Sequence, residues 1–492
     1  MEMKNWLQQR AYITPERLAL TFEEHTWTYE QLNREAERMA RKLTTLGIES
    51  GDHVGFLMEN HPQTVFLIHA LHYLKVVIVP LNKRLSPSEL DYQLEDADVD
   101  WLIVDTQHES KAEDLTFNSV ITMTKLSKQE QVDMKFDGST INLEDLHTII
   151  FTSGTTGHPK GVQLTYGNHW WSATGSALNL GIHEEDRWLC AVPLFHVSGL
   201  SILMRSVIYG MTMVLHQQFE ADRFIRSVHE DKVSIASVVS VMLSNILDSD
   251  EFESFPATFR CMLLGGGPAP YPLLKRCEKT GIPVFQTYGL SESASQIVTL
   301  SPEDSMRKLG SAGKPLFPSQ IKIKSSEADS PSPAGEILIK GPNVTQGYYK
   351  KEKENAEKIK DGWLATGDVG YLDEEGFLYV LDRRKDMFIS GGENVYPAEI
   401  EACLLGHEAV SEAGVIGIAH EKWGKVPAAF VVIKKGKSVT EDDLIAYCTT
   451  RLAGYKVPKK VSFIDDLPRN ASNKLLRREL YRYLEDGDDV EG

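Results

Sequence analysis

The chain has 492 residues, 42% of them hydrophobic, and a formal net charge of −18 at pH 7. This length exceeds what one hydrophobic core organises and suggests about three units of domain size. The acidic balance argues against a nucleic-acid partner held by bulk electrostatics, although local lysines can still bind an anionic substrate.

The sequence shows no sign of export or of a membrane span. Residues 1–7 lack the apolar core of a signal peptide. The most apolar stretch, 66–81, is short and is interrupted by two histidines and a lysine. The cysteines are far apart, odd in number and form no C-x-x-C pair, which favours reduced thiols in the cytoplasm and argues against a zinc site. They are Cys190, Cys261, Cys277, Cys403 and Cys448.

The first hundred residues alternate between predicted helices and strands. Thr28 and Gln31 form a capping box before an amphipathic helix that ends at Gly47. Ser86 opens a later helix, with a proline at its first position and Glu89 at its third. This alternation favours parallel, doubly wound sheets. Strands are predicted at 54–57, 76–79 and 101–104.

Further along the chain the pattern of polar and apolar residues changes twice. Residues 109–143 are polar and weakly periodic, and we expect them to connect into a second sheet. From residue 310, isoleucines recur at every second position on both sides of the turn-rich segment 325–335, a pattern typical of antiparallel hairpins in a small barrel-like subdomain. A break at 382–385 precedes about a hundred residues of mixed helix and strand. The acidic end, 485–492, is expected to be disordered.

The most informative motif follows a predicted buried strand at 148–151. It combines three glycines, four hydroxyl side chains and one lysine within the ten residues 152–161. Glycine lets backbone N–H groups converge on a ligand, and the hydroxyls and the lysine add donors, which suits a polyphosphate. The spacing is not that of a Walker P-loop. A polar surface turn is the alternative, but such a turn rarely needs this combination.

These ten residues resemble the phosphate-binding loop of the acyl-adenylate-forming superfamily. Its members include acyl-CoA synthetases, peptide-synthetase adenylation domains and luciferases, and the motifs below extend the resemblance over nearly the whole chain. The resemblance implies that the loop binds ATP through Thr152, Ser153, Gly154, Thr155, Thr156, Gly157 and Lys160.

Two further motifs match elements that line the acyl pocket in this superfamily. The segment 193–199 carries His196, which the resemblance places at the pocket wall, although a lone histidine is more often structural. The segment 263–268 ends a strand in Gly265, Gly266 and Gly267, whose backbone lines the adenine and acyl sites in the family. Three glycines alone would be weak support.

The segment 288–292 is more specific. The resemblance implies that Tyr288 packs on adenine beside Gly289, that Ser291 contacts the α-phosphate and that Glu292 holds Mg²⁺. Carboxylate oxygens are suitable ligands for a magnesium ion that is also bound by the phosphates of ATP. The family usually has threonine at the position of Ser291, so the hydroxyl is kept. The alternative for Glu292 is a surface carboxylate after a turn.

Three motifs match the ribose site and the boundary of the small domain. Asp368 offers a carboxylate that can accept both ribose hydroxyls, and the family places an arginine at the position of Arg383 to contact the ribose. Lys385 matches the hinge residue. Gly391 and Gly392 form a second glycine turn, which in the family lines the pantetheine channel.

The segment 467–474 matches the element that carries the catalytic lysine, here Lys474. Asn473 replaces the usual glycine, but asparagine tolerates a left-handed conformation. A solvated lysine is the alternative. The candidate catalytic residues are therefore His196, Glu292 and Lys474.

The implied fold is α/β, with a large N-terminal domain of two doubly wound α/β subdomains and a small β-barrel-like subdomain over residues 1–382. A hinge at 383–385 leads to a mobile α+β domain over 386–492. The resemblance implies that this architecture activates a carboxylate with Mg²⁺ and ATP as an acyl-adenylate, then transfers the acyl group to coenzyme A after the small domain turns.

Several stretches resemble the ligases that activate 2-succinylbenzoate in menaquinone biosynthesis of Bacillus-like bacteria. They are 167–169, 177–182, 296–302, 308–317 and 468–477. The spare aromatic carboxylate of that substrate needs a polar partner, for which the candidates are His196, Ser198, Ser201 and Arg205.

Three alternatives stay open: a ligase for another aryl or fatty acid, an adenylation unit that loads a carrier protein, and a non-catalytic nucleotide sensor. We expect small-molecule substrates, no nucleic acid, no membrane span and a cytoplasmic location. The sequence is compatible with a homo-oligomer but does not indicate one.

Overall fold

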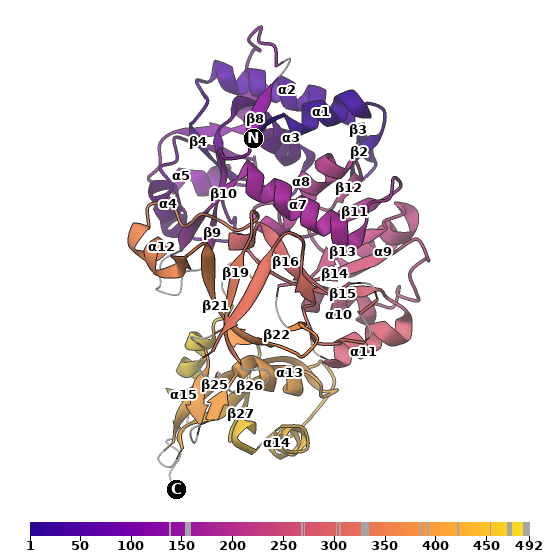
Figure 1. Ribbon diagram of the computed structural model, residues 1–492, viewed down its shortest axis with the longest axis vertical. Helices are drawn as coiled ribbons and strands as arrows, with labels where there is room; N and C mark the ends of the chain where they lie inside the picture. The colour runs from indigo at the N-terminus through magenta and orange to yellow at the C-terminus, as the bar shows by residue number, and fades with distance from the viewer. Residues whose placement is uncertain are drawn as a thin grey trace.

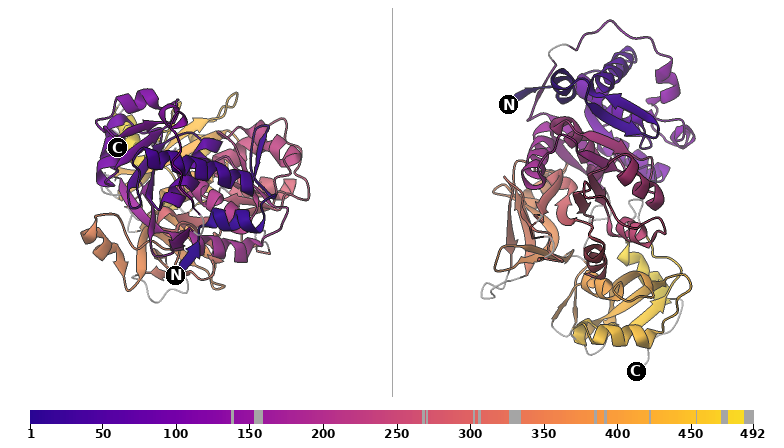
Figure 2. Two further views of the ribbon diagram at one scale, coloured as in Figure 1. Left: turned by 90° about the horizontal axis from the view of Figure 1, so that it is seen from above. Right: turned by 90° about the vertical axis from the view of Figure 1, so that its right-hand side faces the viewer.

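The computed structural model describes residues 1–136, 139–152, 159–266, 269, 271–301, 303–304, 307–325, 334–383, 386–390, 393–420, 423–452, 454–469 and 475–485. The N-terminal part of the chain forms a large body, and the C-terminal residues form a smaller lobe at one end of it (Figure 1, Figure 2). Within the described residues, no helix is long and apolar enough to cross a membrane.

The first sheet has six strands in the order β10-β9-β5-β4-β6-β7, all parallel to their neighbours except the β9–β10 pair. The capping boxes predicted at Thr28 and Ser86 are both present and begin α2 and α4. The predicted strands are confirmed as β4, β5 and β6. The elements are α2 (Tyr29–Thr45), β4 (His53–Leu57), α3 (Pro62–Leu74), β5 (Val77–Pro80), α4 (Pro87–Asp96), β6 (Trp101–Val104), β7 (Val120–Thr122), β9 (Leu146–Thr152) and β10 (Lys160–Thr165).

The segment 109–143 differs from its prediction. It does not lead into a second sheet: β7 extends the first sheet beside β6, and the chain then re-enters that sheet at β9. Short elements of three to five residues carry too few side chains to show a period, so the sequence pattern could not reveal them. They are α5 (Glu109–Glu113), α6 (Met123–Ser127) and β8 (Thr140–Asn142), which pairs with β1 (Glu2–Lys4).

The second sheet has nine strands and begins before the first sheet in the chain. Its order is β17-β16-β15-β14-β13-β11-β12-β2-β3, so the N-terminal hairpin β2–β3 forms one edge. Its strands are β2 (Leu18–Phe22), β3 (His25–Thr28), β11 (Arg187–Cys190), β12 (Thr212–Leu215), β13 (Ile235–Val238), β14 (Cys261–Leu264), β15 (Val284–Leu290), β16 (Ser295–Thr299) and β17 (Lys314–Pro315).

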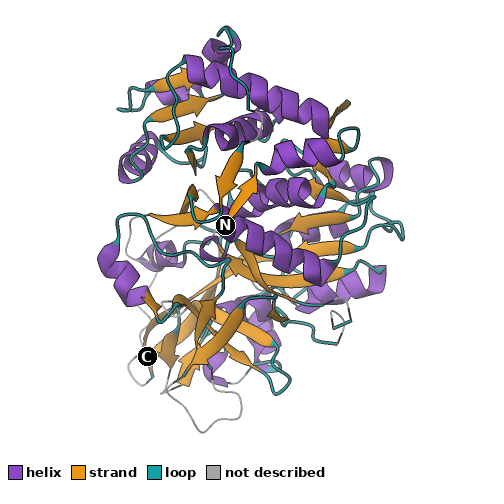
Figure 3. Cartoon of the chain, turned by 45° about the horizontal axis from the view of Figure 1, so that its top comes forward, coloured by secondary structure: helices purple, strands orange, loops and turns teal. Residues whose placement is uncertain are grey.

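Helices pack around the strands of this body, and one large apolar cluster contains residues of both sheets (Figure 3). The strands read as nearly continuous apolar runs because helices cover both faces, as in doubly wound folds. The remaining helices of the body are α1 (Trp6–Ile13), α7 (Tyr166–Leu180), α8 (Val197–Tyr209), α9 (Ala221–Glu230), α10 (Ser240–Asp248) and α11 (Tyr271–Thr280).

An antiparallel sheet of five strands follows, as the alternating isoleucines predict. Ile321 lies opposite Ile339 and Ile323 opposite Ile337 in the β18–β19 ladder. The elements are β18 (Gln320–Lys324), β19 (Gly335–Lys340), α12 (Glu352–Lys358), β20 (Ile359–Lys360), β21 (Trp363–Leu372) and β22 (Leu378–Arg383).

The C-terminal lobe has its own five-stranded sheet and its own apolar core. Helix α13 of this lobe also contacts β22, and Gly406 lies next to Pro272 of α11. The elements are β23 (Phe388–Ser390), β24 (Glu393–Val395), α13 (Pro397–Leu404), β25 (Val410–His420), β26 (Gly424–Ile433), α14 (Glu441–Thr449), β27 (Lys460–Phe463) and α15 (Arg482–Glu485).

Candidate active site

The predicted phosphate-binding loop connects two antiparallel strands. Thr152 ends β9 and Lys160 begins β10, and the two residues lie opposite each other in the ladder. The Lys160 ammonium is buried, forms an ion pair with Glu354 of α12 and lies 5.8 Å from the ring centroid of Tyr348. These contacts therefore fix the ammonium of the motif lysine at the start of β10, where the chain leaves the loop. The predicted ligands Ser153, Gly154, Thr155, Thr156 and Gly157 lie outside the described residues.

Glu292, the predicted magnesium ligand, lies in a short turn after β15 and is fixed by two hydrogen bonds. The Thr345 N–H donates to the Glu292 carbonyl at 2.7 Å, and the Tyr348 hydroxyl donates to Glu292 Oε1 at 2.9 Å. Burial and the charge of Glu292 raise the pKa of Tyr348 above its ordinary value, so this phenol stays a donor. Ser291 begins the same turn.

Gly289 is required for this turn to approach the neighbouring strand. A Cβ atom at Gly289 would lie 1.8 Å from the Ser295 carbonyl oxygen, which no side chain can tolerate. The fold alone therefore requires glycine at position 289, independently of the predicted role of Gly289 in ligand binding.

The predicted adenine and ribose residues meet directly. The Tyr288 hydroxyl donates to Asp368 Oδ2 at 2.8 Å, and both side chains are buried. Burial and the nearby Asp368 carboxylate raise the pKa of Tyr288. Asp368 in turn lies opposite Arg383 in the β21–β22 ladder, so the two residues assigned to the ribose belong to adjacent strands.

Of the glycine turn after β14, Gly265 and Gly266 are described and Gly267 is not. The Gly265 N–H donates to the Val238 carbonyl at 3.1 Å, which aligns the turn with the end of β13. Gly266 has φ +85° and faces Val239, whose Cγ1 would lie 2.9 Å from a Cβ at that position. This position needs glycine both for its conformation and for its space.

His196 lies directly before α8, at the end of a loop that Asn60 holds. Asn60 follows β4; its Oδ1 accepts from the Leu194 N–H at 2.8 Å, and its Nδ2 donates to the Val192 carbonyl at 3.0 Å. Burial and the positive charge of Arg84 lower the pKa of His196 to about 4, so its ring is neutral at pH 7.

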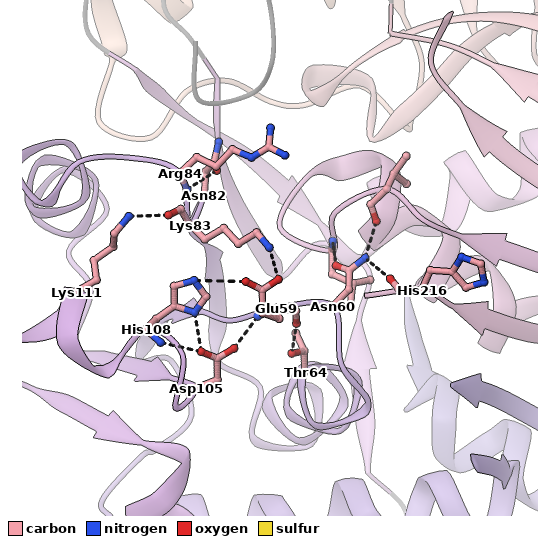
Figure 4. Close-up of polar contacts among 12 residues, drawn as sticks. Glu59, Asn60, Thr64, Asn82, Lys83, Arg84, Asp105, His108, Lys111 and His216 are labelled. Atoms are coloured by element: carbon pink, nitrogen blue, oxygen red, sulfur yellow. Dashed lines mark hydrogen bonds and ion pairs between the residues drawn. The ribbon is translucent and has the colours of Figure 1, made fainter. Parts of the chain in front are cut away.

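A network of charged side chains at the carboxyl ends of β4, β5 and β6 supports the same region (Figure 4). Glu59 forms an ion pair with Lys83 and lies 3.6 Å from His108 Nε2, and His108 Nδ1 lies 2.6 Å from Asp105 Oδ1. The Asp105 carboxylate accepts from the Glu59 N–H at 2.8 Å. These contacts fix the loop that carries Arg84.

Arg205 lies on α8, on the same helical face as Ser198 and Ser201 by spacing. Its side chain is fully buried, and its guanidinium lies 5.6 Å from the ring centroid of Trp188. Nη2 donates to Ser172 Oγ at 3.2 Å, whereas the buried Nε has no hydrogen-bond partner in the part of the chain that the structure describes. Among the described residues no carboxylate pairs with Arg205. Burial lowers its pKa below the ordinary value.

The site also contains functional candidates that the sequence motifs did not reveal, namely Tyr348, Glu354 and Ser172. Each contacts a predicted site residue that is distant in the sequence, and none belongs to a motif that we had singled out. The predicted residues Lys385, Gly391, Gly392 and Lys474, together with Asn473 beside the last, also lie outside the described residues.

Comparison with known proteins identifies this arrangement. The model of the AMP-binding enzyme family matches residues 7–349, and that of the AMP-binding enzyme C-terminal domain matches residues 399–474. The chain belongs to the AMP-binding enzyme family.

Relatives within this family match the chain over nearly its full length. A 2-succinylbenzoate–CoA ligase of Geobacillus sp. (strain WCH70) is 52% identical over 98% of this chain and 97% of its own. The o-succinylbenzoate CoA synthetase of Bacillus subtilis in complex with its acyl-adenylate intermediate is 50% identical, with a TM-score of 0.93 over 98% of both chains. The same enzyme with ATP and a magnesium ion is 49% identical, with a TM-score of 0.91 over 98% of this chain and 100% of the other.

The described residues fit magnesium and ATP. Glu292 supplies a carboxylate in a turn that contacts β10, the strand that begins at Lys160. Mg²⁺ is usually held by one or two carboxylates together with substrate phosphates.

Proposed function

We propose that the protein is an ATP-dependent acid–thiol ligase of menaquinone biosynthesis. It converts 2-succinylbenzoate, ATP and coenzyme A to 2-succinylbenzoyl-CoA, AMP and pyrophosphate through an acyl-adenylate. Full-length relatives at about half sequence identity carry this name, and the buried Arg205 gives it a chemical basis in this chain.

Arg205 is the observation that carries the substrate assignment. Burying a charge is costly unless a partner of opposite charge neutralises it. The described residues provide no such partner, but the aromatic carboxylate of 2-succinylbenzoate would. The edge of a guanidinium formed by Nε and Nη2 suits a carboxylate in a bidentate pair, and here the Nε–H has no partner among the described residues. Benzoate and fatty acids would leave this cation unpaired.

In the first half-reaction, a succinyl carboxylate oxygen attacks the α-phosphorus of ATP and pyrophosphate leaves. We assign Lys160 and the hydroxyls of its loop to the phosphates, with Tyr288 and Asp368 at the nucleoside. Bound Mg²⁺ would neutralise phosphate charge at Glu292. We assign Lys474 to the developing charge between the carboxylate and the α-phosphate, which is a positional and electrostatic role.

In the second half-reaction, the thiol sulfur of coenzyme A attacks the acyl carbonyl and AMP leaves. We assign the loop at Gly391 and Gly392 to the pantetheine channel, reached after the C-terminal domain turns about Lys385. The neutral ring of His196 beside the acyl pocket can accept or donate a hydrogen bond without adding charge. We also propose a cytoplasmic location, because ATP and coenzyme A are available there.

A coupled AMP-release assay over a panel of acids tests the assignment. With coenzyme A present, 2-succinylbenzoate should be the most efficient substrate, ahead of benzoate and a medium-chain fatty acid. A clear preference for either of those acids would reduce the function to that of a generic acyl-CoA ligase. Release of AMP that depends on a carrier protein, and not on free coenzyme A, would instead identify a carrier-loading enzyme.

A further inference from the structure

We propose that Ser172 is a positioning residue that orients Arg205 for the substrate carboxylate and ties it to the turn that carries Glu292. This inference rests on the proposed function and goes one step further, because it names what holds the specificity-determining cation. Ser172 lies on α7, Arg205 on α8 and Glu292 in the turn after β15, so the three elements meet at one hydroxyl.

The directions of the two hydrogen bonds follow from the chemistry of the groups. Ser172 Oγ lies 2.7 Å from the Ala294 carbonyl oxygen and 3.2 Å from Arg205 Nη2. A carbonyl can only accept, so the single hydroxyl proton goes to Ala294. A guanidinium can only donate, so Arg205 donates to the oxygen lone pair. One buried serine hydroxyl therefore satisfies both neighbours.

The contact to Ala294 links this serine to the nucleotide side of the site. Ala294 has φ 51°, a left-handed conformation that disfavours residues with a Cβ atom. Its N–H donates to the Ser291 carbonyl at 3.0 Å, and its carbonyl accepts from Ser172. Both contacts hold the strained residue that directly follows the Ser291–Ser293 turn. Ser172 thereby fixes the distance between the acid-binding cation and the turn at which the phosphates are expected.

Arg205 needs such a support because its other contacts do not fix its orientation. The ring centroid of Trp188 lies 5.6 Å from the guanidinium, and Nε has no hydrogen-bond partner within the described ranges. Without Ser172 the guanidinium could rotate about its long side chain, and the bidentate geometry toward a carboxylate would be lost. The kcat/KM for an acid without the aromatic carboxylate would not depend on this geometry.

The test compares kcat/KM for 2-succinylbenzoate and for 4-oxo-4-phenylbutanoate, which lacks the aromatic carboxylate. The wild-type enzyme, Ser172→Ala and Ser172→Cys are measured in the full chain with MgATP and coenzyme A. Ser172→Cys leaves no cavity and replaces the hydroxyl by a weak donor and acceptor, so it serves if the alanine variant folds poorly. Ser176→Ala makes the same deletion at another buried serine, one turn further along α7.

We expect both Ser172 variants to lower the kcat/KM for 2-succinylbenzoate, relative to that for 4-oxo-4-phenylbutanoate, about tenfold. This is the size expected when a hydrogen bond to a charged group is lost. Ser176→Ala should keep the wild-type ratio. Equal losses for both acids, or an unchanged ratio, would show that Ser172 is merely structural and would overturn the inference. If the wild-type enzyme itself does not distinguish the two acids, the substrate assignment fails instead, so the two failures are distinguishable.

Discussion

The hydroxyl of Tyr348 donates a 2.9 Å hydrogen bond to Oε1 of Glu292, and the ring of the same tyrosine lies 5.8 Å from the ammonium of Lys160. One aromatic side chain thus contacts both the proposed magnesium ligand and the lysine of the phosphate-binding loop. A hydrogen bond to a metal-binding carboxylate fixes which oxygen remains available to the metal. Tyr348 is therefore expected to prepare the site for Mg²⁺ before ATP arrives.

The first prediction concerns this tyrosine. Tyr348→Phe removes the donor and keeps the ring, so the concentration of Mg²⁺ that half-saturates pyrophosphate exchange should rise about tenfold, as is typical when the partner of a metal ligand is lost. Tyr349→Phe, whose hydroxyl contacts Asp98 instead, is the matched control. An unchanged magnesium dependence in Tyr348→Phe would contradict the role that we assign to this contact.

Local features of the fold could be predicted from the sequence, but contacts between distant segments could not. The capping boxes at Thr28 and Ser86 depend on neighbours three residues away, and both are present. Tyr348 and Glu292 are 56 positions apart, and nothing in either segment indicates that they meet. The prediction that segment 109–143 leads into a second sheet was wrong, because a three-residue edge strand has no readable period.

The motifs of the candidate site show the same division. Residue types that a phosphate or a ribose requires were visible in the sequence, and the structure brings Tyr288 and Asp368 into contact. The supporting residues were not visible, because the role of Ser172 depends on its two partners and any buried serine could occupy that position. Such residues are defined by the packing of helices and strands, which only the fold determines.

The second prediction separates the two half-reactions. Lys474→Ala should slow adenylation, measured as pyrophosphate exchange, about a hundredfold to a thousandfold, because one transition-state contact is lost. Transfer to coenzyme A from supplied acyl-adenylate should be nearly unaffected, since the lysine is expected to have left the site by then. Lys435→Ala, at an exposed position of the same domain, is the control. Equal losses in both half-reactions would contradict the expected exchange of loops.

The third prediction is that a change in the glycine turn of the C-terminal domain affects the second half-reaction and not the first. Gly392→Leu should leave pyrophosphate exchange largely intact and slow the transfer to coenzyme A. The reason is steric, because a side chain would intrude where pantetheine is expected to pass. Single-turnover transfer from bound acyl-adenylate measures this step directly. A loss of adenylation with normal transfer would show that the channel lies elsewhere.

The fourth prediction is a loss of stability in mild acid. Buried rings of His69, His72, His147 and His169 contact one another in series, and burial lowers the pKa of His69 and of His169 to about 3. Their ordinary pKa is 6.5, so between these values the unfolded chain binds more protons than the folded one. Stability should therefore be fully present above about pH 6.5 and fall as the pH drops below it, by up to about 1.4 kcal/mol per pH unit for each ring.

Urea unfolding followed by tryptophan fluorescence between pH 7.5 and 5 measures this dependence. His69→Phe replaces a ring whose two nitrogens have no hydrogen-bond partner among the described residues, so it should make the dependence of stability on pH shallower by about one proton. His183→Gln changes an exposed histidine and should leave the slope as it is. If His69→Phe has the wild-type slope, this ring does not contribute to acid sensitivity.

The last prediction tests the charge that selects the acid. Replacing Arg205 by methionine removes a buried cation and keeps most of the side-chain volume, so the fold should tolerate it. In the wild-type enzyme, 4-oxo-4-phenylbutanoate should have a kcat/KM at least about tenfold below that of 2-succinylbenzoate, because a charge-assisted hydrogen bond is missing. In Arg205→Met that order should vanish or reverse, since the aromatic carboxylate would then be buried without a partner. Arg205→Lys should recover little of the preference for 2-succinylbenzoate, because an ammonium cannot reproduce the two parallel hydrogen bonds of a guanidinium.

Steady-state AMP release with both acids measures this preference in the wild-type enzyme and in the two variants. An Arg205→Met enzyme that still prefers 2-succinylbenzoate by the wild-type factor would show that another group binds the aromatic carboxylate, and Ser198 and Ser201 on the same face of α8 would be the next candidates.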